Sequence, residues 1–140
     1  MNVTIRWAAE DDAEALFILV ADFATSFVPG RPSFEISLRE IIPSDAANLS
    51  IAEVDGEIVD YCLGFDHSTF FANGRVSWVE EITVQESFRR NGIGKALMDS
   101  FKEWGAGRGA KLAALATRRA ASFYISIGYE ESATFYRKLL

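Results

Sequence analysis

The chain has 140 residues and an acidic balance, with 20 Asp and Glu against 14 Lys and Arg, for a net charge of −6. This length suits one domain around a single core, and the charge argues against nucleic acid or an anionic membrane surface as the main partner. No apolar run approaches the roughly 20 residues that span a membrane, and the N-terminus lacks a secretory signal pattern. We therefore expect a soluble, cytoplasmic protein without internal disulfides, since Cys62 is the only cysteine.

The first elements in chain order are a strand and two helices. Residues 3 to 7 alternate like a half-buried strand, and Asp11 with Glu14 predicts a helix start of the capping-box kind. The expected core face of that helix holds Ala13, Leu16, Phe17, Val20 and Ala24. After a Pro and Gly turn, Ser33 is the predicted start of a second helix that Pro43 ends.

The middle of the chain predicts a meander of three antiparallel strands. Residues 49–54 and 58–65 flank the hairpin turn Asp55-Gly56, and a second turn at residues 72–74 leads into a strand over 75–84. From Gly92 the apolar period becomes helical.

The last part of the chain predicts a strand at 111–115, a helix at 118–126 and a final strand at 133–139. No repeat or linker divides the chain, so residues 1–140 are expected to form one mixed α/β domain.

The most informative segment joins a strand end to a helix start at residues 84–97. Gly92 and Gly94 let the backbone approach a ligand, and the helix N-terminus behind them offers unpaired N–H groups to a phosphate or pyrophosphate. The spacing does not fit a Walker A loop, and Leu97 stands where a dinucleotide fingerprint needs a small residue. A purely structural turn is the alternative.

The segment resembles the coenzyme A loop of the GNAT superfamily, in which Arg or Gln is followed two residues later by Gly, one residue, and Gly or Ala. Arg89, Gly92 and Gly94 fill those positions, and residues 81–84 are similar to the family's central strand. Residues 120–130 resemble the family's second signature, Ala-x-x-Phe-Tyr-x-x-x-Gly-Phe/Tyr. The resemblance spans nearly the whole chain and implies the GNAT-type acyl-CoA N-acyltransferase fold, a mixed central sheet flanked by helices.

The resemblance also implies that acetyl-CoA is the co-substrate and that an amine attacks its thioester directly. The residues that it places at the cofactor are Ile82, Thr83 and Val84 on the strand, Arg89, Arg90, Asn91, Gly92, Ile93, Gly94 and Lys95 at the pyrophosphate, and Thr117 and Phe123 near the second motif. Thr117 stands where many members have Asn, which leaves one contact to the pantetheine arm in question.

The resemblance points to Tyr124 as the group that donates a proton to the leaving thiolate. An aromatic anchor in the core is the alternative role. Glu80 and Glu81 are candidate bases, and strand alternation lets at most one of them face the substrate directly. No metal site is expected, because the single histidine, His67, has no companion ligands.

Two function hypotheses remain open from the sequence. The first is an N-acetyltransferase acting on a small-molecule or protein amine, and the second is an acetyl-CoA-binding sensor or partner-binding module, which a missing acceptor pocket would favour. Acceptor choice is expected to depend on residues 11–42 and 66–73, where aromatic side chains could line a pocket with Asp22 or Glu35 nearby: Phe23, Phe27, Phe34, Phe70 and Phe71. By analogy, a homodimer could form through the strand at 133–139.

Overall fold

The computed structural model describes residues 2–24, 26–83 and 91–140. Five strands form one sheet in the order in which they occur along the chain. The first three neighbouring pairs are antiparallel, and the last pair, β4 and β5, is parallel. The strands are β1 (Val3–Trp7), β2 (Ala47–Val54), β3 (Glu57–Thr69), β4 (Gly74–Ile82) and β5 (Ala110–Leu115). The mixed α/β sheet predicted from the sequence is confirmed.

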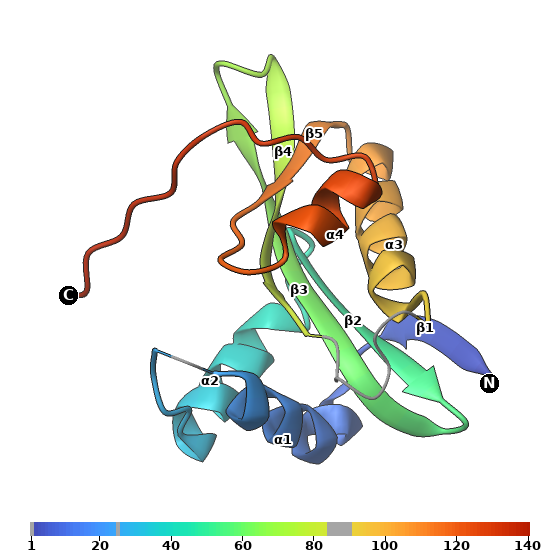
Figure 1. Cartoon of the computed structure of the whole chain (residues 1–140). Helices are drawn as coiled ribbons and strands as arrows, with labels where there is room; N and C mark the ends of the chain where they lie inside the picture. Colours follow the sequence, from blue (N-terminus) through green and yellow to red (C-terminus); the bar gives the residue numbers. More distant parts are fainter. Residues whose placement is uncertain (1, 25, 84–90) are drawn as a thin grey trace.

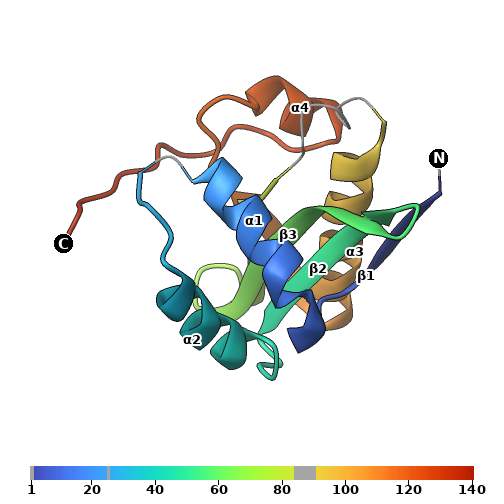
Figure 2. The ribbon, with the colours of Figure 1, turned by 90° about the horizontal axis from the view of Figure 1, so that it is seen from below.

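Helices cover both faces of this sheet (Figures 1 and 2). A 3-10 turn, η1 (Glu10–Asp12), leads into α1 (Ala13–Phe23), and α2 (Arg31–Ile41) follows on the same face. The opposite face carries α3 (Ile93–Gly107) and the short helix α4 (Ala121–Ser126). No helix within the described ranges has the length and apolarity needed to cross a membrane.

Each face of the sheet has its own apolar core. Under α1 and α2, the buried residues include Leu16, Leu38 and Tyr61. Under α3 and α4, they include Phe101 and Tyr124. The alternation of side chains along each strand assigns neighbouring residues to different cores, so Tyr61 and Cys62 lie on opposite faces. A site that spans the sheet therefore draws residues from both cores.

The predicted hairpin turns are confirmed by backbone conformations that favour Gly and Asn. Asp55 and Gly56 have φ of 52° and 86°, as a two-residue turn with the twist of the flanking strands requires. Asn73 has φ of 59° between β3 and β4. These turns hold β2, β3 and β4 in consecutive antiparallel order, which positions the end of β4 for the site described below.

Helix starts differ from the prediction by a few residues. Asp12, rather than Asp11, accepts a hydrogen bond from the Ala9 backbone N–H at 2.7 Å and pairs with Arg6, so the 3-10 turn precedes α1. The second helix begins at Arg31 instead of Ser33, because Pro32 suits a first helical turn.

The final helix begins at Ala121, after the Thr117 hydroxyl accepts the Ala120 N–H at 3.1 Å, whereas residue 118 was predicted.

The predicted C-terminal strand is wrong. Residues 129–140 have no strand, and in Figure 1 this segment runs away from the edge of the sheet. Its side chains find other partners: Phe135 stacks with Trp78 at a centroid distance of 6.5 Å, and Arg137 donates to the Ser26 hydroxyl at 3.0 Å. The segment forms no strand beside β5. The homodimer through this segment stays a prediction.

Candidate active site

The end of β4 carries a bulge and an open edge. Leu63 of β3 pairs with Glu81 and Gly64 with Val79, so Glu80 is the extra residue of the bulge. On the other side, the pairing of β4 with β5 ends at Val79 and Leu115. The stretch of β4 beyond Val79 is therefore paired on one side alone, within the described part of the chain.

The backbone direction at this open edge follows from one hydrogen bond. The Thr83 N–H donates to the Tyr61 carbonyl at 3.1 Å, toward β3. Because successive strand residues direct their N–H and C=O groups to opposite edges, those of Ile82 point to the open side. An extended ligand can pair with them like an added strand.

Glu81 faces the α1–α2 side of the sheet, where it meets a buried tyrosine. The Tyr61 hydroxyl donates to Glu81 Oε1 at 2.7 Å, and Tyr61 is 3% exposed. Burial, together with the Glu81 carboxylate, raises the pKa of Tyr61 well above its ordinary value of 10. The phenol thus stays protonated and orients the carboxylate.

Glu80 has a different environment. The Trp78 indole N–H donates to Glu80 Oε2 at 3.1 Å, and the Glu80 side chain is exposed at the bulge. It does not line a described pocket. Both glutamate side chains are exposed, but of the two only Glu81 lines a described pocket. The bulge interrupts the strand alternation on which the prediction of opposite faces depended.

A pocket of about 230 Å³ lies beside Glu81, and we call it the α1–α2 pocket. Its walls come from α1, from the turn before α2, from α2 itself and from the inner face of β2 and β3. Most lining side chains are apolar. The residues are Leu16, Val20, Pro29, Gly30, Ser33, Phe34, Ser37, Leu38, Ile41, Leu49, Tyr61, Leu63 and Glu81.

Tyr124 lies on the other face of the sheet, in α4. It is 8% exposed and packs in the core that contains Cys62, with Ile82 against the same cluster. Its ring meets Phe123 at 5.0 Å and Tyr129 at 6.1 Å, each edge to face. Burial, with smaller contributions from Cys62 and Tyr129, raises the pKa of Tyr124 to about 12.

The N-terminus of α3 has features that favour an anion. Gly92 is its N-cap with φ of 80°, and nothing lies within 4 Å of the position where a Cβ would project. Asn91 and Gly92 are exposed, whereas Ile93 and Gly94 are buried. The first turn of α3 contains no acidic residue, so its unpaired N–H groups and dipole favour a negative ligand.

Three other predicted cofactor residues have partners within the protein. Lys95 pairs with Asp99 at 2.6 Å on the surface of α3, so its charge is partly engaged. Phe123 is half-buried and packs on Tyr124, and the Thr117 hydroxyl is used by the Ala120 N–H. Val84, Arg89 and Arg90 lie outside the described residues. That acetyl-CoA binds along the open strand edge and at the α3 N-terminus stays a prediction.

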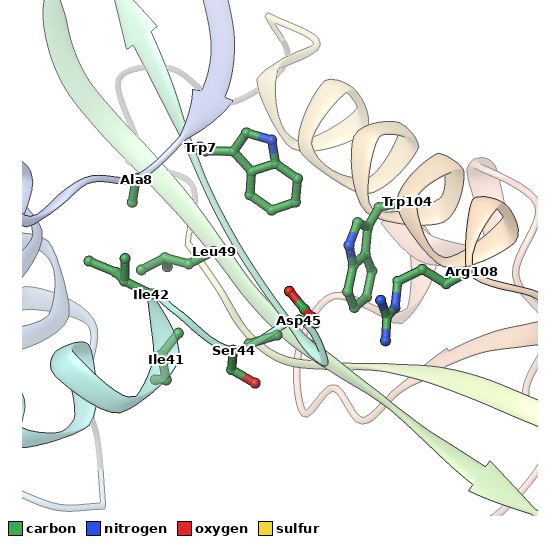
Figure 3. Close-up of a pocket in the computed structure, with 10 residues that line it drawn as sticks. Trp7, Ala8, Ile41, Ile42, Ser44, Asp45, Leu49, Trp104 and Arg108 are labelled. Carbon is green, nitrogen blue, oxygen red and sulfur yellow. The ribbon is translucent and has the colours of Figure 1, made fainter.

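A second, larger cleft of about 350 Å³ lies elsewhere, and we call it the Trp7 cleft. Figure 3 shows the indoles of Trp7 and Trp104 with the side chains of Asp45 and Arg108 nearby. Trp104 and Arg108, which line this cleft, lie near the C-terminal end of α3, whereas Gly92 caps its first turn, so about 18 to 24 Å of helix separates the cleft from the anion site. The Trp7 cleft is therefore the larger cavity, but it is remote from the N-terminus of α3.

The sequence did not point to Tyr61, and it predicted only part of the lining of the α1–α2 pocket. Of the five candidate phenylalanines, Phe34 lines the α1–α2 pocket, whereas Phe27, Phe70 and Phe71 are exposed. The tip of the β3–β4 hairpin lies at the end of the sheet away from α1 and α2 in Figure 1, so the residue range 66–73 is not part of this pocket. The missed signal was alternation: Tyr61 occupies the same face of β3 as Leu63.

Comparisons with known proteins identify the family. Residues 45–131 match the model of the acetyltransferase (GNAT) domain, while no curated protein matches. A glucosamine-6-phosphate N-acetyltransferase from Arabidopsis thaliana has the same fold, with a TM-score of 0.87 and 19% identity over 99% of each chain. A transcriptional regulator from Bacillus halodurans superposes with a TM-score of 0.89 and 25% identity over 99% of this chain and 100% of its own.

A third similar structure contains the cofactor. It is aminoglycoside N-acetyltransferase AAC(6')-Iy in complex with CoA, with a TM-score of 0.85 and 23% identity over 98% of this chain and 95% of its own. The family model covers more than half of the chain, so the chain belongs to the GNAT acetyltransferase family. It is accordingly an acetyl-CoA-dependent N-acetyltransferase, as its motifs predicted.

The α3 N-terminus offers a direct test of cofactor binding. In Gly92→Asp, a carboxylate would face the cofactor's pyrophosphate, and repulsion between charges a few ångströms apart should weaken acetyl-CoA binding by about tenfold or more. Asp and Asn both tolerate a positive φ, so Gly92→Asn is a control of the same shape without the charge. Isothermal titration calorimetry measures both. Equal affinity for acetyl-CoA in the two variants would show that the pyrophosphate does not bind at this helix end.

Proposed function

We propose that this enzyme transfers an acetyl group to a primary amine held in the α1–α2 pocket, with Glu81 as base and Tyr124 as hydrogen-bond donor to the leaving thiolate. The observation that carries the proposal is the position of β4. Its open edge lies between the pocket with Glu81 on one face and the core with Tyr124 on the other.

The acceptor reaches the pocket as an ammonium ion at neutral pH and must lose a proton before it attacks. Glu81 receives that proton, directly or through one water, and Tyr61 keeps its carboxylate oriented toward the pocket. The amine nitrogen then bonds to the thioester carbonyl carbon. Its attack builds oxyanion charge that the backbone N–H groups at the open edge of β4 can stabilise.

The carbon–sulfur bond breaks next, and charge collects on sulfur. Tyr124, with a pKa of about 12, keeps its proton throughout the neutral range. A thiol has a pKa of about 8.5, so complete proton transfer from this phenol would be uphill. We therefore assign Tyr124 the role of donating a hydrogen bond as the thiolate forms, and the proton on sulfur comes finally from the nitrogen or solvent.

The alternative, an acetyl-CoA-binding module without efficient catalysis, would be favoured by the absence of an acceptor pocket. The α1–α2 pocket with a carboxylate beside the open strand edge instead supports catalysis. We also propose that residues 1–140 act as one domain, since both cores pack on the same sheet. The cytoplasmic location and the lack of nucleic-acid and membrane partners stay predictions.

Glu81→Gln tests the proposed base. The amide oxygen can still accept the Tyr61 hydroxyl, so the fold should persist, while kcat/KM for an amine acceptor should fall by about 10² to 10⁴. Release of free CoA from acetyl-CoA, followed with a thiol reagent over a panel of amines, measures the rate. Glu80→Gln should stay within about twofold of wild type. Equal losses in the two variants would contradict the assignment.

A further inference from the structure

The α1–α2 pocket has a composition that narrows the class of acceptor. Its polar groups occur in two places: the Tyr61–Glu81 pair on the sheet, and the hydroxyls of Ser33 and Ser37 on α2. Between them the lining is formed by aliphatic and aromatic side chains such as Leu16, and Phe34 contributes a ring held edge to face against Phe17 at 5.3 Å. An ammonium group thus has one anionic partner, and the remainder of the acceptor contacts apolar surface.

The charges around the pocket oppose an anionic acceptor. The described residues contribute no Lys, Arg or His to its lining. Arg31, next to the pocket residue Gly30, is already engaged, since it pairs with Glu14 at 2.9 Å and Glu35 at 3.0 Å and lies over the Phe17 ring. A carboxylate or phosphate on the acceptor would lose its hydration without gaining a partner.

Size limits the acceptor as well. The pocket volume of about 230 Å³ is below the roughly 300 to 1,000 Å³ of sites for drug-sized ligands. A multi-ring acceptor would leave most of its surface outside the pocket.

We propose that the acceptor is a compact primary amine with an uncharged, apolar body, and that the α1–α2 pocket selects it. This inference rests on the proposed transfer to an amine beside Glu81. The ammonium group lies at Glu81, the alkyl or aryl body lies between α1, α2 and the sheet, and the hydroxyls of Ser33 and Ser37 mark the exposed α2 side.

Steady-state kinetics with matched amines test the proposal. Across propylamine, butylamine and pentylamine, kcat/KM should rise by about fourfold per methylene until the pocket is full. Phenethylamine should exceed phenylalanine, which differs by one carboxylate, by at least about 10²-fold. Butylamine should likewise exceed 1,4-diaminobutane, which would place a second ammonium group among apolar side chains.

Two tryptophan substitutions test which of the two cavities binds the acceptor. Ser37→Trp, at an exposed position that lines the α1–α2 pocket, should lower kcat/KM for pentylamine by at least about tenfold with unchanged affinity for acetyl-CoA. Ser44→Trp makes the same change in the Trp7 cleft and should leave pentylamine kinetics as in wild type. Loss of transfer in the Ser44 variant alone would move the acceptor to the Trp7 cleft and overturn the proposal.

The outcomes separate this inference from the proposed function. Preferred transfer to glucosamine 6-phosphate, phenylalanine, 1,4-diaminobutane or a lysine-containing peptide, still dependent on Glu81, would overturn the inference and leave the proposed reaction standing. Absence of transfer to every amine, with acetyl-CoA bound, would overturn both. A rise along the alkylamine series with the Ser37 effect would support both.

Discussion

Replacement of Tyr124 by Phe is expected to lower kcat by about 10² to 10⁴ while the dissociation constant for acetyl-CoA changes by less than about threefold. The ring stays in its core site against Phe123 and Tyr129, so the variant removes the hydroxyl alone. Its role arises only as charge develops on sulfur, so the loss should appear in kcat. Stopped-flow or steady-state assays at saturating acetyl-CoA measure it.

Tyr129→Phe is the matched control for this experiment. Tyr129 is a half-buried neighbour in the same core, and burial raises its pKa as well. Its hydroxyl is buried and has no hydrogen-bond partner among the described residues, so removing it should leave kcat near the wild-type value. If Tyr124→Phe retains full turnover, Tyr124 is an aromatic anchor only, and the leaving thiolate is stabilised by another group.

Asp66→Asn is expected to lower the free energy of unfolding by about 3 kcal/mol, a loss of roughly 10 °C in melting temperature. The Asp66 side chain is fully buried in β3 and pairs with Arg75 of β4 and with Arg108 just after α3, each at 2.5 Å. An asparagine would leave the like charges of Arg75 and Arg108 close together, with Asp45 near Arg108 as the remaining counter-charge. Urea unfolding measures the difference, and Asp99→Asn, which removes an exposed pair with Lys95, should cost less than about 1 kcal/mol.

The contribution of Asp66 should depend on pH in a defined direction. Burial by itself raises the pKa of this carboxyl, but hydrogen bonds from Arg75 and Arg108 outweigh it and hold the pKa below its ordinary value of 3.8. Because the folded state binds the proton more weakly than the unfolded state, the stabilisation is fully present above about pH 4 and is lost as the pH falls through the lowered folded value. The stability gap between wild type and Asp66→Asn should therefore be constant from pH 7 to about 5 and shrink below 4. A gap that grew on acidification would contradict this account.

Local signals in the sequence were sufficient for the five strands of the sheet and for the family, but they also suggested a sixth strand that does not form. The Asp55-Gly56 turn, the alternation in β1 and the change to a helical period at Gly92 each reflect backbone geometry within a few residues. The coenzyme A loop and the Phe123-Tyr124 signature predicted the family that the comparison with known domains confirms. The sequence could not predict the fate of residues 129–140, because their pattern suits a strand and their observed partners, Trp78 and Ser26, are distant along the chain.

The sequence by itself determined the fold class, the family and a short set of candidate groups at residues 80–95 and 124, since these depend on residue type and local spacing. The tertiary structure decided which glutamate lies beside a pocket, because the bulge at Glu80 changes the direction in which each side chain points. It also brought Tyr61 to Glu81 and closed α1 and α2 over the sheet to form an apolar pocket. These contacts join residues that are 20 or more positions apart in the sequence. Such residues come together only when the strands pair and the helices pack on the sheet.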